Sequence, residues 1–506
     1  MSATGKAPLL SGRLLVRNTV WNLVGIALPL VVALWAVPRL IHGMGAERFG
    51  LLSLVLLAVG YFSLFDLGVG RALTKLVAER LATGDTATLP SLIRTALLLM
   101  GGLGVVAALL VAALAPWLSG SVFSMSESLR AEALWTFLLL AGTLPFVISS
   151  AAFTGLLEAH QRFDRIAAVR VPLGVSNYVG PVLLLAYSQS LVVITAFLSV
   201  TRVLAWIAFA LMSRGSARAS TLSSPAFDRS AVRALLAFGG WITVSNVIGP
   251  VMVYFDRFLI GAALDLDAVA FYTTPYEVLT RLWVLPNALM GVLFPAFAAA
   301  LASDSSRAVH VFRVSNAFLL CAMAVPVGLC VLFAGEGLTL WLGADFAARS
   351  TAVAQWLAVG VYINCVARLP FVAVQGHGRP DVTGKLHFAE ALVFVPLLWV
   401  LVQRFGIVGA AFGWTLRIVV DTCALFLINA RLVTVLRRES HRALWSALAA
   451  TAALGLLAVP NGLTLKLVLA LMLIVVSALF SLRFLRLSGR ALPFIGGGKA
   501  EEVRGA

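Results

Sequence analysis

The residues most able to do chemistry in this sequence are charged side chains placed inside long apolar stretches. Glu277 and Arg281 are four residues apart, as are Arg417 and Asp421, so each pair lies on one face of a helix. Further charges inside or at the ends of apolar stretches are Arg202, Arg368, Asp256 and Arg257. A charge at the centre of a membrane helix costs about 2.5–3.5 kcal/mol on insertion scales and usually faces the protein interior. Two interpretations stay open: the charges form buried ion pairs that hold helices together, or they line a cationic cavity.

The sign of these interior charges favours an anionic ligand. Interior cations outnumber interior acids, and the guanidinium group of arginine fits phosphate oxygens in bidentate fashion. A pump for organic cations needs the opposite arrangement, a lone buried carboxylate that exchanges substrate for a proton. The middle of the first apolar stretch, residues 19–38, contains no acid.

Composition places the helices that carry these charges in a membrane. The 506 residues are 61% hydrophobic and 12% charged, and the mean hydropathy is +0.99, whereas soluble domains keep about 25% charged residues. A helix needs about 20 apolar residues to cross the hydrocarbon core. That length predicts fourteen spans, near 19–38, 49–70, 92–117, 132–157, 170–187, 190–212, 235–260, 276–300, 309–333, 352–375, 386–403, 407–430, 443–459 and 464–483.

The distribution of the 38 Lys and Arg residues predicts the orientation. Most of them fall in the tails and in the loops on the side of both termini, and such loops are cytoplasmic. We therefore expect a multi-pass membrane protein with both termini in the cytoplasm. The formal charge of +16 then indicates contact with anionic lipid and not with nucleic acid.

Several kinds of chemistry have no motif in the sequence. There is no G-x-x-x-x-G-K-[ST] for ATP, no H-E-x-x-H and no Cys/His cluster for zinc. We expect neither an enzyme nor a metal site nor a cofactor. All four cysteines fall within spans, which predicts packing residues without disulfides: Cys321, Cys330, Cys365 and Cys423. The function that remains after these exclusions is transport, driven by an ion gradient or by substrate flow.

The two halves of the chain carry a weak internal repeat. Trp21 and Pro29 have counterparts in Trp241 and Pro250, about 220 residues later, and the motif H-x-R-x-D occurs twice, 217 residues apart. Repeats of this kind are common in transporters. Each proline lies in mid-helix, where its ring bends the helix. A fixed kink and a hinge for alternating access are both open for Pro29 and Pro250.

The repeat partners lie six spans apart, an even number, so the two halves have the same orientation. We expect an all-α integral membrane protein with two six-helix lobes, related by a pseudo-two-fold axis along the membrane normal, and two more helices at the C-terminus. The expected divisions are a cytoplasmic N-terminal tail, an N-lobe, a cytoplasmic linker, a C-lobe, two further spans and a cytoplasmic C-terminal tail: 1–18, 19–212, 213–234, 235–430, 443–483 and 484–506.

Four stretches resemble a known family. "RFGLLSLVLLAVGYFSLFDLGVGRALTK" at 48–75 resembles the second-helix region of bacterial O-antigen and exopolysaccharide flippases of the multidrug/oligosaccharidyl-lipid/polysaccharide (MOP) exporter superfamily. "YFDRFLIGAAL" at 254–264 resembles the opening of the second lobe in that family. "LLEAHQRFDR" at 156–165 and "VQGHGRPDV" at 374–382 resemble its cytoplasmic loops.

The resemblance implies a lipid-linked substrate. It implies a MATE-like fold that moves an undecaprenyl-pyrophosphate-linked sugar or oligosaccharide from the cytoplasmic to the periplasmic face by alternating access, for surface polysaccharide biosynthesis. The polysaccharide polymerase and its chain-length machinery would be protein partners. Substrate contacts in the pyrophosphate and glycan cavity are assigned to Arg281, Arg368, Arg202, Arg257, Arg39 and Arg417. Coupling to protons or sodium, or gating, is assigned to Asp66, Asp256, Glu277, Asp421, Pro29 and Pro250.

Other functions in the same superfamily stay open. A multidrug/cation antiporter would favour a buried acid in the core of its first or seventh helix. Flippases for the lipid-linked peptidoglycan precursor resemble this chain in size but carry arginines within the first helix, and here that helix has only Arg17 at its entrance and Arg39 at its exit. A glycan polymerase would need a large periplasmic loop, and no long loop interrupts the spans.

Overall fold

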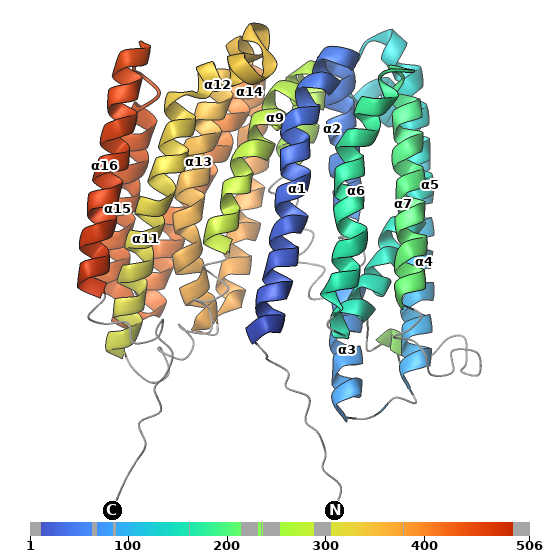
Figure 1. Cartoon of the computed structure of the whole chain (residues 1–506), viewed down its shortest axis with the longest axis horizontal. Helices are drawn as coiled ribbons and strands as arrows, with labels where there is room; N and C mark the ends of the chain where they lie inside the picture. Colours follow the sequence, from blue (N-terminus) through green and yellow to red (C-terminus); the bar gives the residue numbers. More distant parts are fainter. Residues whose placement is uncertain are drawn as a thin grey trace, which may run out of the picture. The chain divides into compact units, whose positions relative to one another are not determined.

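A computed structural model gives the fold (Figure 1). It describes residues 12–62, 68–83, 85, 88–160, 162–213, 231–233, 235, 254–287, 305–377 and 379–488. Every regular element in these ranges is a helix. Eight of the described helices are long and apolar enough to cross a membrane. The all-α membrane fold is therefore confirmed, whereas the count of fourteen spans stays a prediction.

The chain forms two compact units, Met1–Thr274 and Pro275–Ala506. The division falls within helix α9 (Leu266–Thr280). The lobe boundaries expected from the repeat, 19–212 and 235–430, stay predictions.

The first unit is built from helices that run the length of the predicted spans. Its elements are α1 (Gly12–Met44), α2 (Ala46–Phe62), α3 (Val69–Thr83), α4 (Leu89–Trp117), a π-helical turn (Leu118–Val122), α5 (Glu127–Ala159), α6 (Phe163–Leu184), α7 (Leu191–Ser213) and the start of α9. Helix α5 packs on α4 and on α7, and α6 packs on α1 and on α7. The predicted spans at 92–117, 132–157, 170–187 and 190–212 coincide with α4, α5, α6 and α7.

Glycine allows the closest helix contacts in this unit. A Cβ at Gly104 of α4 would lie 2.5 Å from Cα of Pro145 in α5, so any larger residue would push the two backbones apart. A Cβ at Gly155 of α5 would lie 2.7 Å from the carbonyl oxygen of Gly70 in α3. Such close contacts between small residues are typical of membrane helices, where dispersion contacts drive association.

The predicted span at 49–70 does not continue as one helix through its last residues. Helix α2 ends at Phe62 and α3 begins at Val69. Gly68 has φ +67°, a left-handed conformation that other residues rarely adopt, and its carbonyl oxygen accepts a 2.9 Å hydrogen bond from the Ala72 N–H. Gly68 therefore interrupts the predicted span directly before α3.

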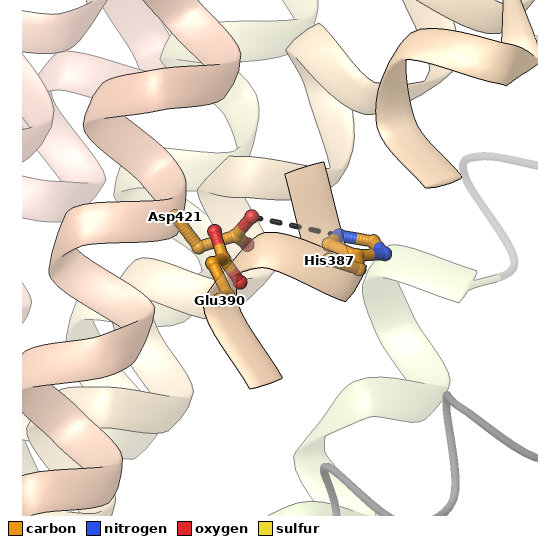
Figure 2. Close-up of side chains that lie close together, drawn as sticks. All are labelled: His387, Glu390 and Asp421. Carbon is orange, nitrogen blue, oxygen red and sulfur yellow. Dashed lines mark ion pairs between the residues drawn. The ribbon is translucent and has the colours of Figure 1, made fainter. Parts of the chain in front are cut away.

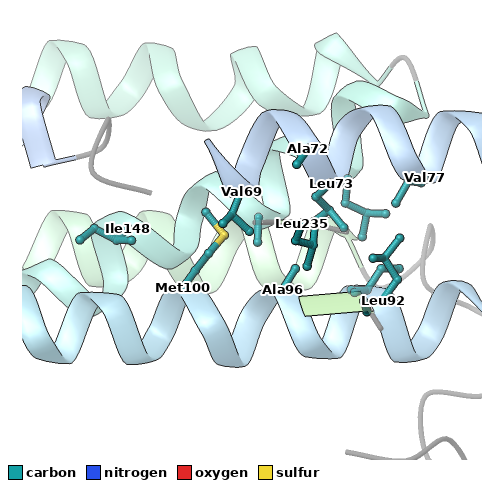
Figure 3. Close-up of a cluster of buried hydrophobic side chains, with 13 residues drawn as sticks. Val69, Ala72, Leu73, Val77, Leu92, Ala96, Met100, Ile148 and Leu235 are labelled. Carbon is teal, nitrogen blue, oxygen red and sulfur yellow. The ribbon is translucent and has the colours of Figure 1, made fainter. Parts of the chain in front are cut away.

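Helix α3 is held by an apolar cluster (Figure 3). One face of α3 contributes Val69, Ala72, Leu73 and Val77. These side chains pack on Leu92, Ile93, Ala96 and Met100 of α4, on Ile148, Ala152 and Leu156 of α5, and on Ala231 and Leu235. The spacing of three and four residues along α3 places its apolar residues on one side of the helix.

The second unit is arranged around one buried helix. Its elements are the end of α9, a 3-10 turn (Arg281–Trp283), α11 (Ser305–Leu332), α12 (Ala334–Leu342), α13 (Ala344–Gly376), α14 (Pro380–Leu432), a 3-10 turn (Thr434–Leu436), α15 (Arg437–Leu456) and α16 (Leu463–Ser488). Helix α13 packs on α11, α12, α14 and α15 and is the most buried of the candidate spans. The short helix α12 was not predicted from the sequence.

Helix α14 contains two predicted spans, 386–403 and 407–430. Gly406 breaks it, with φ +58° and ψ −143°, so that two helical segments meet at this residue. A glycine is required there because the left-handed region is strained for residues with a side chain. The break places residues of the first segment beside residues of the second. The predicted spans at 235–260 and 276–300 lie largely outside the described residues.

Candidate functional site

The two segments of α14 bring together a charged cluster that we call the α14 cluster: His387, Glu390, Arg417 and Asp421. Figure 2 shows His387, Glu390 and Asp421 facing one another, with His387 and Glu390 on the first segment and Asp421 on the second. Asp421 Oδ1 lies 3.5 Å from His387 Nε2, and Arg417 Nη1 lies 3.9 Å from Glu390 Oε2. The Arg417–Glu390 ion pair and the His387–Asp421 contact therefore link the two segments.

The carboxylates of the α14 cluster are deeply buried. The side chains of Glu390 and Asp421 are each 8% exposed. Three carboxylate oxygens of the cluster make no hydrogen bond: both oxygens of Glu390 and Oδ1 of Asp421. Buried polar atoms are normally hydrogen-bonded, so unpaired ones need an explanation such as an unseen proton, ion or water.

The α14 cluster has the donor atoms for a cation. One ligand atom from each of His387, Glu390 and Asp421 lies within 4.8 Å of the others. The guanidinium of Arg417 already places a permanent positive charge beside Glu390, at 3.9 Å. With His387 counted as neutral, two carboxylates and one guanidinium leave a single uncompensated negative charge. One bound proton balances this charge, whereas a divalent metal would leave a surplus of positive charge next to Arg417.

Of the two pairs with i, i+4 spacing, one forms an ion pair within its own helix and the other finds its partners on another segment. Glu277 Oε2 and Arg281 Nη2 form an ion pair at 3.5 Å on one helical face, in half-exposed positions. Arg417 and Asp421 share the same spacing, but each has its ionic partner on the first segment of α14. The partners belong to a different segment because the break at Gly406 folds that segment back onto the second one.

Arg368 of α13 is a half-buried cation without an acidic partner in the described part of the chain. Its Nη1 donates a hydrogen bond to the side-chain oxygen of Asn287, and its guanidinium lies 5.4 Å from the centre of the Trp283 ring. Its Nε makes no hydrogen bond. Asn287 is neutral, so the positive charge of Arg368 is not compensated by these contacts.

Arg202 of α7 is fully enclosed, with 7% of its surface exposed. It donates hydrogen bonds to the carbonyl oxygen of Leu198, at 2.9 Å, and to Oδ1 of Asn177 in α6, at 3.3 Å. The void beside it has a volume of about 10 Å³, which is room for one water at most. In this conformation Arg202 joins α6 to α7 and has no room for a phosphate.

Asp256 and Arg257 are buried in the first unit. Asp256 Oδ1 accepts a 2.8 Å hydrogen bond from the Arg257 N–H and lies 3.9 Å from Arg257 Nη1, and Asp256 Oδ2 accepts a 2.5 Å hydrogen bond from Tyr272. The Arg257 guanidinium lies 4.9 Å from the centre of the Tyr254 ring. The two predicted residues are therefore brought together, in a packed site without exposed surface.

The remaining predicted site residues lie elsewhere. Arg39 is exposed, donates a 2.6 Å hydrogen bond to the Trp35 carbonyl and lies over the Trp35 ring. Pro29 lies within the continuous helix α1, where its ring packs against Gly174 of α6. Asp66 and Pro250 lie outside the described residues. The roles assigned to all twelve residues stay predictions.

Sequence reasoning missed His387 and Glu390. Both lie in the predicted span at 386–403, and Glu390 stands three residues after His387, on the same helical face. An acid inside an apolar span is itself a signal for a functional site. Asn287 and Trp283, which hold Arg368, are uncharged and gave no comparable signal.

The comparisons with known proteins agree with this architecture. A family model described as "Polysaccharide biosynthesis protein" matches residues 15–301. The chain is 30% identical over 433 residues, 83% of its own length and 99% of the relative's, to a protein of Shigella flexneri named "Putative O-antigen transporter".

Solved structures show the same fold at low sequence identity. A MATE family multidrug resistance transporter of the MOP superfamily, in an inward-facing conformation, aligns with a TM-score of 0.69 at 16% identity, covering 82% of this chain and 99% of that one. The lipid II flippase MurJ, in an inward closed conformation, aligns with a TM-score of 0.68 at 11% identity, covering 93% and 99%. The chain belongs to the polysaccharide biosynthesis protein family and has the fold of the MOP superfamily.

Proposed function

We propose that this protein flips an undecaprenyl-pyrophosphate-linked oligosaccharide from the cytoplasmic to the periplasmic face of the bacterial inner membrane. The family and the name of the Shigella flexneri relative support transport of a lipid-linked polysaccharide precursor. A multi-pass membrane fold fits a substrate whose lipid tail stays in the bilayer. The proposal assigns the chain a transport role without a catalytic step, by alternating access, with both termini in the cytoplasm.

The environment of Arg368 is the observation that best supports an anionic substrate. Its guanidinium is half-buried and is held by an amide and an indole ring, with no carboxylate to neutralise it in the part of the chain that the structure describes. A charge kept uncompensated in a partly dry site attracts an ion of opposite sign strongly, because the local dielectric is low. Arginine can give a phosphate oxygen pair two parallel hydrogen bonds. Arg368 is therefore proposed to bind the pyrophosphate.

The α14 cluster is proposed to couple transport to protons. At an effective dielectric constant of 20, the 3.9 Å contact between Arg417 and Glu390 is worth about 4 kcal/mol. A second charge on Asp421, within 4.8 Å of Glu390, opposes it by about 3.5 kcal/mol. Burial of both carboxylates adds a further cost to the doubly ionised state. One proton shared by Glu390 and Asp421 removes the repulsion, and its loss is a step that a proton gradient can drive.

Loss of Arg368 tests the substrate site. In cells depleted of the wild-type protein, Arg368→Ala should lower the rate at which lipid-linked glycan becomes accessible from the periplasm by at least tenfold. Loss of a charge-assisted hydrogen bond costs about 1.5–3 kcal/mol. Arg404→Ala, at an exposed arginine of α14, is the matched control and should flip normally. Normal flipping by Arg368→Ala, at equal protein amounts, would assign substrate binding elsewhere.

Proteoliposomes separate coupling from binding. Flipping by the wild type should respond to an imposed pH gradient, and Glu390→Gln/Asp421→Asn should lose this response while still binding lipid-linked glycan. A response to a sodium gradient in place of a pH gradient would overturn proton coupling without affecting the substrate. Flipping of the lipid-linked peptidoglycan precursor alone, or export of cationic drugs alone, would refute the proposed substrate.

A further inference from the structure

A groove in the second unit has no role in the flipping scheme. It lies between α11, α13, α15 and α16 and has a volume of about 640 Å³, within the range of about 300–1,000 Å³ that is usual for small-ligand sites. We call it the α15–α16 groove. Small side chains on α15 leave the space open: Ala443, Ser446, Ala450 and Ala453.

Most of the α15–α16 groove is apolar. From α11 it is lined by Leu320 and Ala324, and from α16 by Leu469, Leu473 and Val476. The hydroxyl of Tyr362 points to the backbone and donates a 3.0 Å hydrogen bond to the Leu320 carbonyl. This lining suits hydrocarbon chains, since each buried CH₂ contributes about 0.8 kcal/mol.

One end of the α15–α16 groove is charged. Glu439, on α15, accepts hydrogen bonds at 2.9 and 3.2 Å from Arg313 of α11 and at 2.9 Å from Arg442 of α15. The Glu439 side chain is 10% exposed, whereas those of Arg313 and Arg442 are 59% and 54% exposed. Two arginines share one carboxylate, so this end of the groove carries a net positive charge with free guanidinium surface.

Glu439 keeps its own charge at neutral pH. The hydrogen bonds and positive charge of Arg313 hold the pKa of the Glu439 carboxyl below its usual range, and Arg442 adds to this effect. The charge at the end of the groove is therefore one unit positive through the physiological range.

We propose that the α15–α16 groove binds a membrane glycerophospholipid with an anionic headgroup. The acyl chains lie along α11 and α16, and the headgroup phosphate contacts Arg313 and Arg442. A basic pocket between membrane helices, at the end of an apolar groove, is a known arrangement for anionic headgroups. The site is independent of the proposed flipping function, because neither Arg368 nor the α14 cluster lines it.

A single phosphate fits this end better than a glycan. The groove offers a sugar few groups, since its uncharged polar lining is limited to Asn316, Ser446, Ser477 and the engaged Tyr362. The Nδ2 of Asn316 already donates a 3.4 Å hydrogen bond to Ser446, which leaves the amide one buried oxygen, Oδ1, as an acceptor. The net charge of one matches a monoanionic headgroup such as phosphatidylglycerol.

Lipid binding to the delipidated full-length protein in detergent tests the proposal. Native mass spectrometry should show tighter binding of phosphatidylglycerol than of phosphatidylcholine to the wild type. Arg313→Gln/Glu439→Gln/Arg442→Gln removes the net charge without leaving a lone carboxylate. This triple variant should bind phosphatidylglycerol about fivefold more weakly, which corresponds to roughly 1 kcal/mol for one cationic charge at an anionic lipid surface. Arg438→Gln, at an exposed arginine of α15 outside the groove, should change nothing.

A second pair of variants tests the apolar part. Ala450→Trp fills the groove and should lower binding of both phospholipids, whereas Ala449→Trp, at an exposed neighbour outside the lining, should not. Equal affinity of the wild type for the two lipids, or unchanged binding by Ala450→Trp, would refute the proposal. Displacement of phosphatidylglycerol by undecaprenyl phosphate at a lower concentration would assign the groove to an isoprenoid lipid instead.

Discussion

Replacement of Arg417 by glutamine should destabilise the protein strongly at neutral pH and only weakly at acidic pH. The guanidinium lies 3.9 Å from Glu390 Oε2, and this contact is worth about 4 kcal/mol at an effective dielectric constant of 20. Without it, the buried carboxylate must either remain charged without a partner or take up a proton. Protonation of a glutamate with an ordinary pKa of about 4.3 costs roughly 4 kcal/mol at pH 7.5 and about 1 kcal/mol at pH 5.

The sign of the pH dependence follows from proton binding. The folded Arg417→Gln variant holds a proton that its unfolded chain releases at neutral pH, so its stability decreases as the pH rises. We expect a loss of about 4 kcal/mol at pH 7.5 and about 1 kcal/mol at pH 5, relative to the wild type. The double variant Arg417→Gln/Glu390→Gln removes both charges and should recover most of the loss.

Reversible unfolding of the purified protein in mixed micelles, at the two pH values, measures these differences. Arg404→Gln replaces an exposed arginine of the same helix and should stay within about 0.5 kcal/mol of the wild type. A loss below 1 kcal/mol at pH 7.5, or an equal loss at both pH values, would show that Arg417 does not balance a buried carboxylate. Failure of the double variant to recover would point to lost packing against Phe394, which lies 5.3 Å below the guanidinium.

Three further outcomes follow from the structure. Glu439→Gln should lower the thermal stability at neutral pH, and the difference from the wild type should shrink as the pH falls below the ordinary glutamate pKa of about 4.3, because a carboxyl with a lowered pKa contributes stability that is lost as it protonates. Gly104→Ala should destabilise the protein by about 1–3 kcal/mol in the same unfolding assay, since its Cβ would meet the backbone of α5, whereas Gly101→Ala meets nothing within 4 Å. Arg202→Ala should reduce the amount of folded protein in membranes, because a buried hydrogen-bonded link is lost, whereas Arg368→Ala should leave that amount unchanged.

The fold was largely predictable because its strongest signal is local. A run of about 20 apolar residues must form its backbone hydrogen bonds internally, so length and hydropathy predict a membrane helix without tertiary information. This reasoning located α4 to α7, α11, α13 and α16. It did not predict that α3 begins as a separate helix at Val69, because hydropathy does not report the positive φ of Gly68.

The candidate site was only partly predictable, because sequence spacing reports neighbours on one helix only. The ion pair of Glu277 and Arg281 lies within one helical turn, on the shared face that the i, i+4 spacing predicts. The same spacing holds for Arg417 and Asp421, but their partners come from the segment before Gly406, which the spacing does not report. A break in a helix reverses the chain and creates contacts between residues that are about thirty positions apart.

The interior arginines differ in the groups that their guanidinium groups contact. Arg417 faces a carboxylate and stabilises the protein, Arg202 fills its site with two oxygen acceptors, and Arg368 keeps an uncompensated charge beside an amide and an indole ring. In the sequence each is an arginine in an apolar span, and only Arg417 has an acid four residues later on the same helical face. A binding role requires charge that the protein itself has not neutralised, because an arginine already paired must break that pair before it can hold a phosphate. By this criterion we propose Arg368 as the substrate contact, whereas Arg417 and Arg202 are engaged in contacts between helical segments.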